Sequence, residues 1–197
     1  MKNTTAGIFT VNSTSDKALM MKVKNGDLDK LGLLFERYNR PLFRFFYRMC
    51  KDNQVSEDLV QSVFERILRY RESYSGSGKF STWLFSVARN AHIDHYRKEQ
   101  RNVDSIEIDE ERLEVESEDP VTVHNKESKK HLLERALDRL DEDKREIVIL
   151  SRYEGLKYKE IAEILDSTEG AIKVKMFRAM KELRDLVNHL KDEYSYE

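Results

Sequence analysis

The chain has 197 residues, which is enough for one large domain or two small ones. Only seven glycines and two prolines accompany many Leu, Ile, Lys, Glu and Arg residues, a composition that favours helices. The single cysteine, Cys50, excludes an intrachain disulfide and indicates a reducing compartment, which we expect to be the cytoplasm. Its aromatic surroundings favour a buried small side chain over a redox or nucleophilic role.

The N-terminal sequence MKNTTAGIFTVNSTSDK is polar and rich in Ser, Thr and Asn. Its apolar stretch, residues 8–11, is too short for the core of a signal peptide, and no apolar run in the chain approaches the length of a bilayer crossing. We therefore expect no membrane insertion. The polar composition predicts a flexible tail over residues 1–23. A first helical module is expected over residues 24–101.

Apolar residues of the first module recur at helical spacing. The first stripe runs through two segments that Pro41 separates or kinks, because proline lacks an N–H and clashes with the preceding turn. A second helix is predicted over residues 55–70, with Ser56 as its N-cap. A third is predicted over residues 81–98, with Trp83 in its buried stripe.

A strongly acidic segment follows the first module. Residues 102–120 contain nine acids and one base, a net charge of −8; because the whole chain carries −2, the remainder carries +6. The linker, residues 102–126, has no clear helical period and contains Pro120, so we expect it to be extended or disordered in isolation. The near-neutral net charge of the whole chain is therefore the sum of two basic modules and the acidic linker that joins them.

The second module, residues 127–190, begins with two predicted helices and ends before a short tail over residues 191–197. Its most informative segment is YKEIAEILDSTEGAIKVKMFRAMKELR, which has the pattern of a short helix, a tight turn and a second helix. Thr168 lies at the turn as an N-cap residue, and Glu169 adds negative charge where the helix dipole favours it. The inward stripe of the second helix comprises Ile172, Met176, Ala179, Leu183 and Leu186.

The other side of that helix is cationic. Between positions 171 and 184 there are five basic residues and one acid, and the basic residues fall off the apolar stripe: Lys173, Lys175, Arg178, Lys181 and Arg184. A helix-turn-helix with an exposed basic face is the geometry that enters a DNA major groove. Lysine-rich faces of helical hairpins are also ordinary solvated surfaces, and this segment alone favours DNA binding over that alternative.

Two blocks of the sequence resemble a known family. LVQSVFERILRY followed by KFSTWLFSVARNAHIDHYRK is similar to the second region of bacterial RNA polymerase sigma factors. LDRLDEDKREIVILSRYEGLKYKEIAEIL with TEGAIKVKMFRAMKELR is similar to the fourth region, and the lack of a third domain between them resembles the ECF (extracytoplasmic function) group. Asp141, Ala171 and Val174 depart from the family pattern, so the promoter sequence preference does not transfer.

The resemblance implies an all-α protein of two small helical domains that acts as an alternative sigma factor. Since the sequence shows no glycine-rich phosphate loop, no Ser/His/Asp set and no carboxylate pair in a cleft motif, we expect no enzymatic activity and no cofactor. Its partners would be promoter DNA and core RNA polymerase, through the clamp helices of the largest subunit and the flap. Asp58, Gln61 and Glu65 share one helical face and would dock on the clamp helices; a solvated surface is the alternative. An anti-sigma factor is a usual partner in the family, but no residue here demonstrates one.

The resemblance also divides the DNA contacts between the modules. The serine- and glycine-rich loop and the third helix would recognise and open the minus-ten element, with Tyr74 as a candidate for stacking on unpaired bases. The residues concerned are Tyr74, Lys79, Arg89, Asn90, His95, Arg97 and Lys98. The minus-thirty-five element would be read by Thr168, Glu169, Gly170, Lys173, Lys175, Arg178 and Lys181.

Other interpretations remain open at this point. The runner-up is a helix-turn-helix regulator whose N-terminal module is a sensor, and that module would need a ligand pocket. A polymerase-binding decoy is a third class, which the intact basic face disfavours. The linker charge either mimics nucleic acid or keeps a spacer soluble. His92 and His95 lack an obvious third ligand, so a metal site is not expected.

Overall fold

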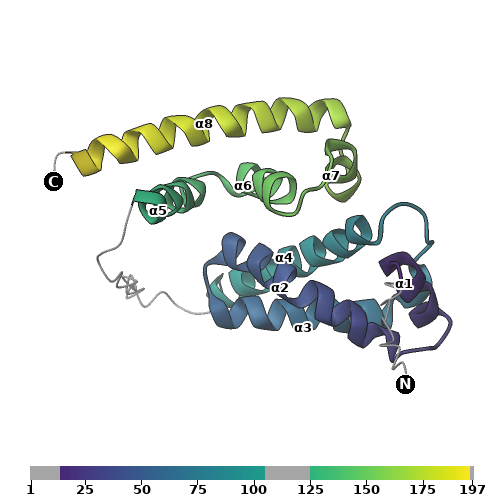
Figure 1. Cartoon of the computed structure of the whole chain (residues 1–197). Helices are drawn as coiled ribbons and strands as arrows, with labels where there is room; N and C mark the ends of the chain where they lie inside the picture. The colour runs from purple at the N-terminus through teal and green to yellow at the C-terminus, as the bar shows by residue number, and fades with distance from the viewer. Residues whose placement is uncertain (1–13, 105–124, 196–197) are drawn as a thin grey trace, which may run out of the picture.

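The computed structural model describes residues 14–104 and 125–195. Within these ranges every regular element is helical, as the all-α prediction requires. Figure 1 shows the helices gathered in two groups, which correspond to the two predicted modules. The first module contains α1 (Asp16–Lys24), α2 (Lys30–Cys50), α3 (Asn53–Arg69), the short turn η1 (Arg71–Ser73) and α4 (Phe80–Asp104).

The second module contains α5 (Asn125–Asp138), α6 (Glu142–Val148), the π-helical turn η2 (Ile149–Tyr153), α7 (Tyr158–Ile164) and α8 (Glu169–Ser195). The long helix α8 packs along α5, α6 and α7, as Figure 1 shows. Helix α8 continues to Ser195, so the expectation of a tail from residue 191 is wrong for residues 191–195. Both described ends of the expected linker, residues 102–104 and 125–126, are helical as well.

Helix α1 occupies much of the stretch expected to be a flexible tail. Three of its side chains, Leu19, Met20 and Val23, are buried in the core, and the Ser15 hydroxyl caps the helix by accepting from the Ala18 N–H at 3.3 Å. Asp16 also accepts a hydrogen bond from the Tyr38 hydroxyl of α2 at 2.7 Å. The prediction of a tail is therefore wrong for residues 16–23, while residues 1–13 lie outside the described part.

Of the two alternatives expected at Pro41, separation into two helices is wrong, because α2 is one helix with Pro41 inside it. A proline within a helix costs about 3 kcal/mol. Leu34 before it and Leu42, Phe45 and Phe46 after it are all fully buried. Since burying each such side chain contributes about 1.5–3 kcal/mol, packing on both sides of the proline outweighs the cost.

Helix α3 begins at Asn53, two residues earlier than the helix expected over residues 55–70. Asp52, rather than Ser56, caps α3, because its carboxylate accepts from the Val55 N–H at 2.8 Å. Ser56 is fully buried one turn into the helix, and its hydroxyl donates to the Asp52 carbonyl. Cys50 is half-buried and its thiol donates to the Phe46 carbonyl at 3.1 Å, in keeping with the structural role expected for it.

The two modules contact each other through α2 and α4 of the first. Helix α4 packs against α7, and the end of α2 meets η2 and α6. The Arg48 guanidinium lies 4.0 Å from the centre of the Tyr153 ring, and Lys51 pairs with Asp138 at 2.7 Å. Burial at this contact raises the pKa of the Glu154 carboxyl to about 7, and the nearby Arg48 and Arg44 charges offset the rise only in part.

Truncating Met20 tests the contribution of α1. We expect Met20→Ala to lower the free energy of unfolding by about 2–4 kcal/mol, because it leaves a cavity in a fully buried site. Leu28→Ala is the control, since Leu28 is 48 % exposed and should change stability by less than about 0.5 kcal/mol. Urea titrations followed by circular dichroism measure both; equal small losses would show that α1 does not belong to the core.

Glu154 predicts how stability depends on pH. Because its folded pKa, about 7, lies above the ordinary value of 4.5, the fold favours the protonated form. The free energy of unfolding is therefore highest, as far as Glu154 is concerned, below pH 4.5, and it falls as the pH rises through 7. Glu154→Gln should therefore gain about 1–3 kcal/mol over the native chain between pH 5 and pH 8, by paired urea titrations. Parallel pH profiles for the two chains would contradict this.

Candidate nucleic-acid interface

Helices α7 and α8 and the turn between them form the predicted helix-turn-helix. Helix α7 ends at Ile164 with Leu165 as its C-cap. The turn then passes through Asp166, whose φ of 47° is left-handed, a conformation that aspartate tolerates better than most residues. The Ser167 N–H then donates to the Ala162 carbonyl at 2.9 Å. Thr168 caps α8 by accepting from the Ala171 N–H at 3.1 Å, as predicted. These bonds fix the angle at which α8 leaves the turn.

Four of the five residues of the predicted inward stripe of α8 are buried and Leu186 is partly buried, so the outer face of the helix is defined. Ile172, Met176, Ala179 and Leu183 are between 0 % and 5 % exposed. The predicted contact residues lie on the exposed part of the helix: Thr168, Glu169, Gly170, Lys173, Lys175, Arg178 and Lys181. Their cationic groups, from Lys173 to Lys181, therefore face solvent along about two turns.

Sequence reasoning missed two apolar residues on this outer face. Phe177 is 73 % exposed, and Val174, one turn earlier, is 50 % exposed. Both lie among Lys173, Lys175 and Arg178 rather than against the core. Val174 and Phe177 follow Ile172 by two and five residues and lie off the buried stripe, which was the available signal. An exposed phenylalanine beside cations suits contact with thymine methyl groups in a major groove.

Acids lie close to some of the cations of α8. Glu169 pairs with Lys173 at 2.7 Å, and this lysine lowers the pKa of the Glu169 carboxyl. Lys175 and Arg178 line a hollow of about 410 Å³ with Asp141, Glu142 and Asp143 at the start of α6.

The loop before α4 differs from the expectation for Tyr74. Its ring is 1 % exposed and packs on Phe80 and Trp83, with ring centroids 6.1 and 5.0 Å away. The Tyr74 carbonyl accepts from the Lys24 ammonium at 2.6 Å, which fastens the loop to α1. Stacking of Tyr74 on a base would expose this core residue, so that assignment is corrected. Trp83 lies partly buried against the core, close to its expected place.

The basic side chains of α4, together with Lys79 just before it, fall into two sets. Three groups meet acids of the second module: Lys79 lies 2.8 Å from Glu160, Arg89 lies 3.2 Å from Glu146, and His92 lies 3.5 Å from Glu142. Burial lowers the pKa of His92, and Glu142 opposes that shift. Further along α4 the predicted residues Asn90, Arg97 and Lys98 are exposed, and His95 is half-buried with Glu99 at 3.4 Å. Tyr96, 49 % exposed, is an aromatic residue of this part that sequence reasoning missed.

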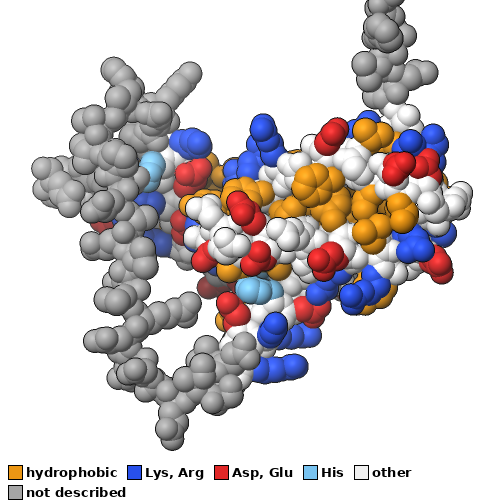
Figure 2. Space-filling model, turned by 90° about the horizontal axis from the view of Figure 1, so that it is seen from below, with side chains coloured by type: hydrophobic (Ala, Val, Ile, Leu, Met, Phe, Trp, Pro, Cys, Tyr) orange, Lys and Arg blue, Asp and Glu red, His pale blue; other side chains and the backbone are white. Residues whose placement is uncertain are grey.

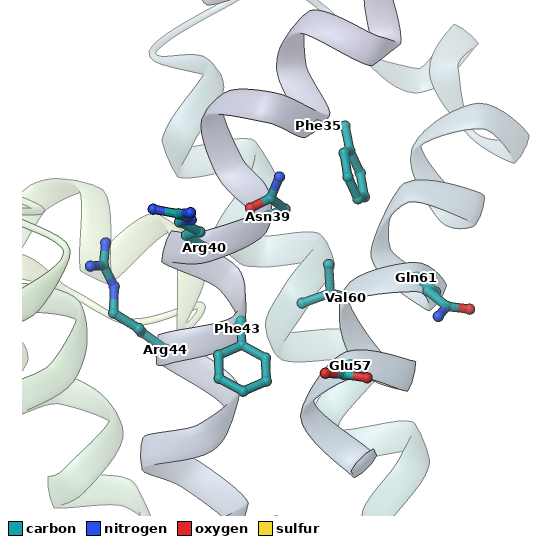
Figure 3. Close-up of a pocket in the computed structure, with 8 residues that line it drawn as sticks. All are labelled: Phe35, Asn39, Arg40, Phe43, Arg44, Glu57, Val60 and Gln61. Carbon is teal, nitrogen blue, oxygen red and sulfur yellow. The ribbon is translucent and has the colours of Figure 1, made fainter. Parts of the chain in front are cut away.

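A groove separates α2 from α3 on the first module. Its volume is about 490 Å³ and it is lined by Phe35, Asn39, Arg40, Phe43, Arg44, Glu57, Val60 and Gln61. Figure 3 shows Phe35, Phe43 and Val60 between the two helices, Glu57 and Gln61 on α3, and both arginines on the far side of α2. Figure 2 shows apolar side chains gathered on the underside of this module with charged groups around them.

The predicted polar face of α3 borders this groove. Gln61 lines it, and Asp58 and Glu65 are exposed one turn to either side. Asp58 accepts a hydrogen bond from Gln54 at 3.2 Å. The groove thus combines an apolar floor with a polar margin on α3 and arginines on α2, an arrangement that fits an amphipathic helix.

Two further observations concern metal binding and membrane spans. In the described residues, no group of three or more His, Cys, Asp or Glu side chains could hold a metal ion. None of the helices within residues 14–104 and 125–195 has both the length and the apolar character needed to span a bilayer.

Comparison with known proteins identifies both modules. Residues 34–102 match the Sigma-70 region 2 family and residues 130–183 match the Sigma-70 region 4 family. The chain is 34 % identical to the ECF RNA polymerase sigma factor SigM of Bacillus subtilis over 79 % of its length and 93 % of the relative's. It is 32 % identical to the RNA polymerase sigma factor CarQ of Myxococcus xanthus, covering 87 % and 97 % of the two chains.

Solved structures share the fold. CnrH, solved in complex with the cytosolic domain of CnrY, superposes with a TM-score of 0.65 at 20 % identity, over 89 % of this chain and 99 % of that one. The sigma factor RpoE of Bartonella quintana, solved with the anti-sigma factor NepR, gives 0.62 at 24 % identity, over 80 % and 96 %. Both matched regions occur in the order found from the sequence, and the chain belongs to the ECF group of the sigma-70 family of RNA polymerase sigma factors.

Proposed function

We propose that this alternative sigma factor directs transcription initiation in the cytoplasm by placing two of its helices on promoter DNA and its α2–α3 groove on core RNA polymerase. The observation that carries the proposal is the outer face of α8, where Lys175, Phe177 and Arg178 are exposed beside a fully buried stripe. A helix that presents cations and an aromatic ring outward, fixed by a capped turn, suits a major groove.

At the minus-thirty-five element, the two kinds of side chain on α8 would do different work. Lys175 and Arg178 contact phosphates and guanine edges, and each phosphate contact releases counterions. Phe177 contacts thymine methyl groups, so it contributes to sequence preference without releasing counterions. Val174 extends the apolar strip by one turn. The affinity of α8 for DNA would therefore have a salt-dependent part and a salt-independent part.

At the minus-ten element, α4 would hold the separated strand. Asn90, Arg97 and Lys98 are exposed along α4, and Lys79 and Arg89 join them once their acidic partners leave. Because Tyr74 is buried, Tyr96 takes its place as the aromatic ring able to stack on an unpaired base. Base stacking of this kind contributes about 1–3 kcal/mol.

The groove would bind a helix of the polymerase. Phe35 and Phe43 offer an apolar floor, and Asp58, Gln61 and Glu65 offer polar partners along its margin. The match to the sigma family supports the clamp helices of the largest subunit as the occupant. The two solved relatives are complexes with CnrY and with the anti-sigma factor NepR, so an anti-sigma factor is a proposed competitor for the surfaces of this chain.

Run-off transcription from a randomised promoter library tests the function directly. With core polymerase, the native chain should enrich two sequence elements at fixed spacing. Lys175→Ala with Arg178→Ala should reduce transcription and lower the log–log salt slope of promoter binding by about 2, or about 1 per lost contact. Phe177→Ala should reduce transcription and leave the slope unchanged.

The matched control for those variants is Arg69→Ala with Arg152→Ala, which removes two exposed charges away from α8. It should keep both transcription and the salt slope. A library with no enriched element would refute the function, whereas native slopes in the α8 double variant would refute only the placement of α8.

Docking on core polymerase is tested at the margin of the groove. Asp58→Arg with Gln61→Ala should weaken binding to core polymerase by about tenfold or more, because it removes a polar contact and reverses a charge beside the groove. Glu72→Arg with Gln100→Ala makes the same chemical change at exposed sites elsewhere. Titration of labelled chain by core enzyme measures both; equal affinities for the two double variants would remove α3 from the polymerase interface.

A further inference from the structure

We propose that helix α1 positions the loop of residues 74–79, which leads into α4, and that this positioning makes promoter opening faster. The effect on opening rests on the proposed minus-ten role of the loop and α4; the positioning itself does not. Helix α1 contacts η1 and α4, the two helical elements that flank the loop. Its residues Lys17, Met21 and Lys24 follow one another at steps of four and three, so they share one face of the helix.

Two glycines make the 74–79 loop costly to order. Gly76 and Gly78 have φ values of 71° and 69°, in the left-handed region that favours glycine. Glycine also loses more conformational freedom on ordering than any other residue. A loop with two glycines among six residues therefore keeps one conformation only where neighbouring elements hold it.

Lys24 holds the first residue of the loop. Its ammonium donates to the Tyr74 carbonyl at 2.6 Å, and a hydrogen bond from a charged donor is about twice as strong as one between neutral groups. Because Tyr74 is buried, a partner within the protein must satisfy this carbonyl. Lys24 lies at the end of α1, whose residues Leu19 and Val23 are buried in the core, so the base of the donor side chain is fixed as well.

Two other side chains of α1 cover the middle of the loop. A Cβ atom added at Gly76, which is buried, would lie 3.2 Å from the Met21 Sδ atom and 3.7 Å from the Lys17 Cε atom. These side chains therefore pack directly on the loop backbone, in the space that the absent side chain leaves. At Gly78 the same atom would meet none of the described residues within 4 Å, apart from its chain neighbours. The contact with α1 is thus confined to the first half of the loop.

The anchored loop presents its polar groups to solvent in a fixed arrangement. Ser75 and Ser77 are exposed, their hydroxyl oxygens lie 2.5 Å apart, and the Ser77 N–H donates to the Ser75 hydroxyl at 3.1 Å. Hydroxyls can both donate to and accept from the edge of an unpaired base. Since α1 orders the loop before DNA arrives, strand capture does not carry that entropic cost. Lys24 is therefore a positioning residue, which acts on DNA through the loop.

The positioning is tested in the free full-length chain by NMR relaxation. We expect native backbone order parameters of about 0.85 for the amides of residues 75–78, and values below about 0.6 in Lys24→Ala. Lys22→Ala is the matched control, because it removes the same charge from an exposed site on the same helix and should leave the loop rigid. Circular dichroism establishes that both variants are folded. A loop that is flexible in the native chain, or equally rigid in both variants, would overturn the positioning.

The contact at Gly76 is tested with a pair of glycine variants. Gly76→Ala and Gly78→Ala impose similar backbone strain, since the two φ values differ by 2°, but only the first places a methyl group against α1. Gly76→Ala should therefore shift the methyl resonance of Met21, and Gly78→Ala should leave it in place. Equal shifts in the two variants, or no shift in either, would mean that α1 does not pack on the loop.

The effect on opening is measured with core polymerase on a duplex promoter recovered from the run-off library. Lys24→Ala should slow the appearance of permanganate-reactive thymines at least about threefold relative to Lys22→Ala, with closed-complex affinity unchanged. Its log–log salt slope should equal that of the control, because a positioning residue contacts no phosphate. A slope lower by about 1 would make Lys24 a phosphate contact and overturn its positioning role.

The two parts of the inference fail separately from each other and from the proposed function. Native opening by a Lys24→Ala chain whose loop has become flexible would overturn the effect on opening and leave the positioning intact. Equal losses of closed-complex affinity and of opening in Lys24→Ala would also overturn it, because they would reflect general destabilisation. If no promoter element is enriched, the proposed function fails, and the order parameters of the free chain still decide whether α1 holds the loop.

Discussion

The pairing of α4 cations with acids of the second module is the interaction on which the arrangement of this protein depends. Two faces of helix α4 make different contacts. One buries Leu84, Phe85 and Ala88 in the first module, and the other presents Arg89 and its neighbours to the second module. The buried face fixes the rotation of the helix about its axis. The basic side chains on the opposite face therefore keep their direction, and carboxylates, water or DNA phosphates must solvate their charges.

Much of the fold followed from apolar spacing, because spacing depends only on which residues a helix can bury. The stripe of α8 and the Thr168 cap were predictable for this reason. Helix α1 was not, because three buried residues, Leu19, Met20 and Val23, are too few to show a period next to a polar tail. The continuity of α2 through Pro41 depends on tertiary packing, which a local rule for proline does not include.

Some residues of the candidate site were predictable from the sequence and others were not. The cations of α8 and α4 were identified from their charge and position, but charge alone does not reveal a partner from another module. The acid that meets Arg89 lies 57 residues further along the chain, so no local pattern signals it. Tyr74 was misassigned because a loop position suggests exposure, whereas its ring packs on Trp83. Phe177 was missed because an exposed phenylalanine is evident only when the buried stripe is known.

Zero-length carbodiimide crosslinking of the native chain tests the central claim most directly, because it joins amines only to carboxylates in contact. Lys79 with Glu160 and Lys51 with Asp138 are within 2.8 Å and 2.7 Å and join different modules. Mass spectrometry of the free chain should find both crosslinks within one molecule, with mixed isotopic labelling to exclude links between chains. Their absence from the free chain would contradict the account.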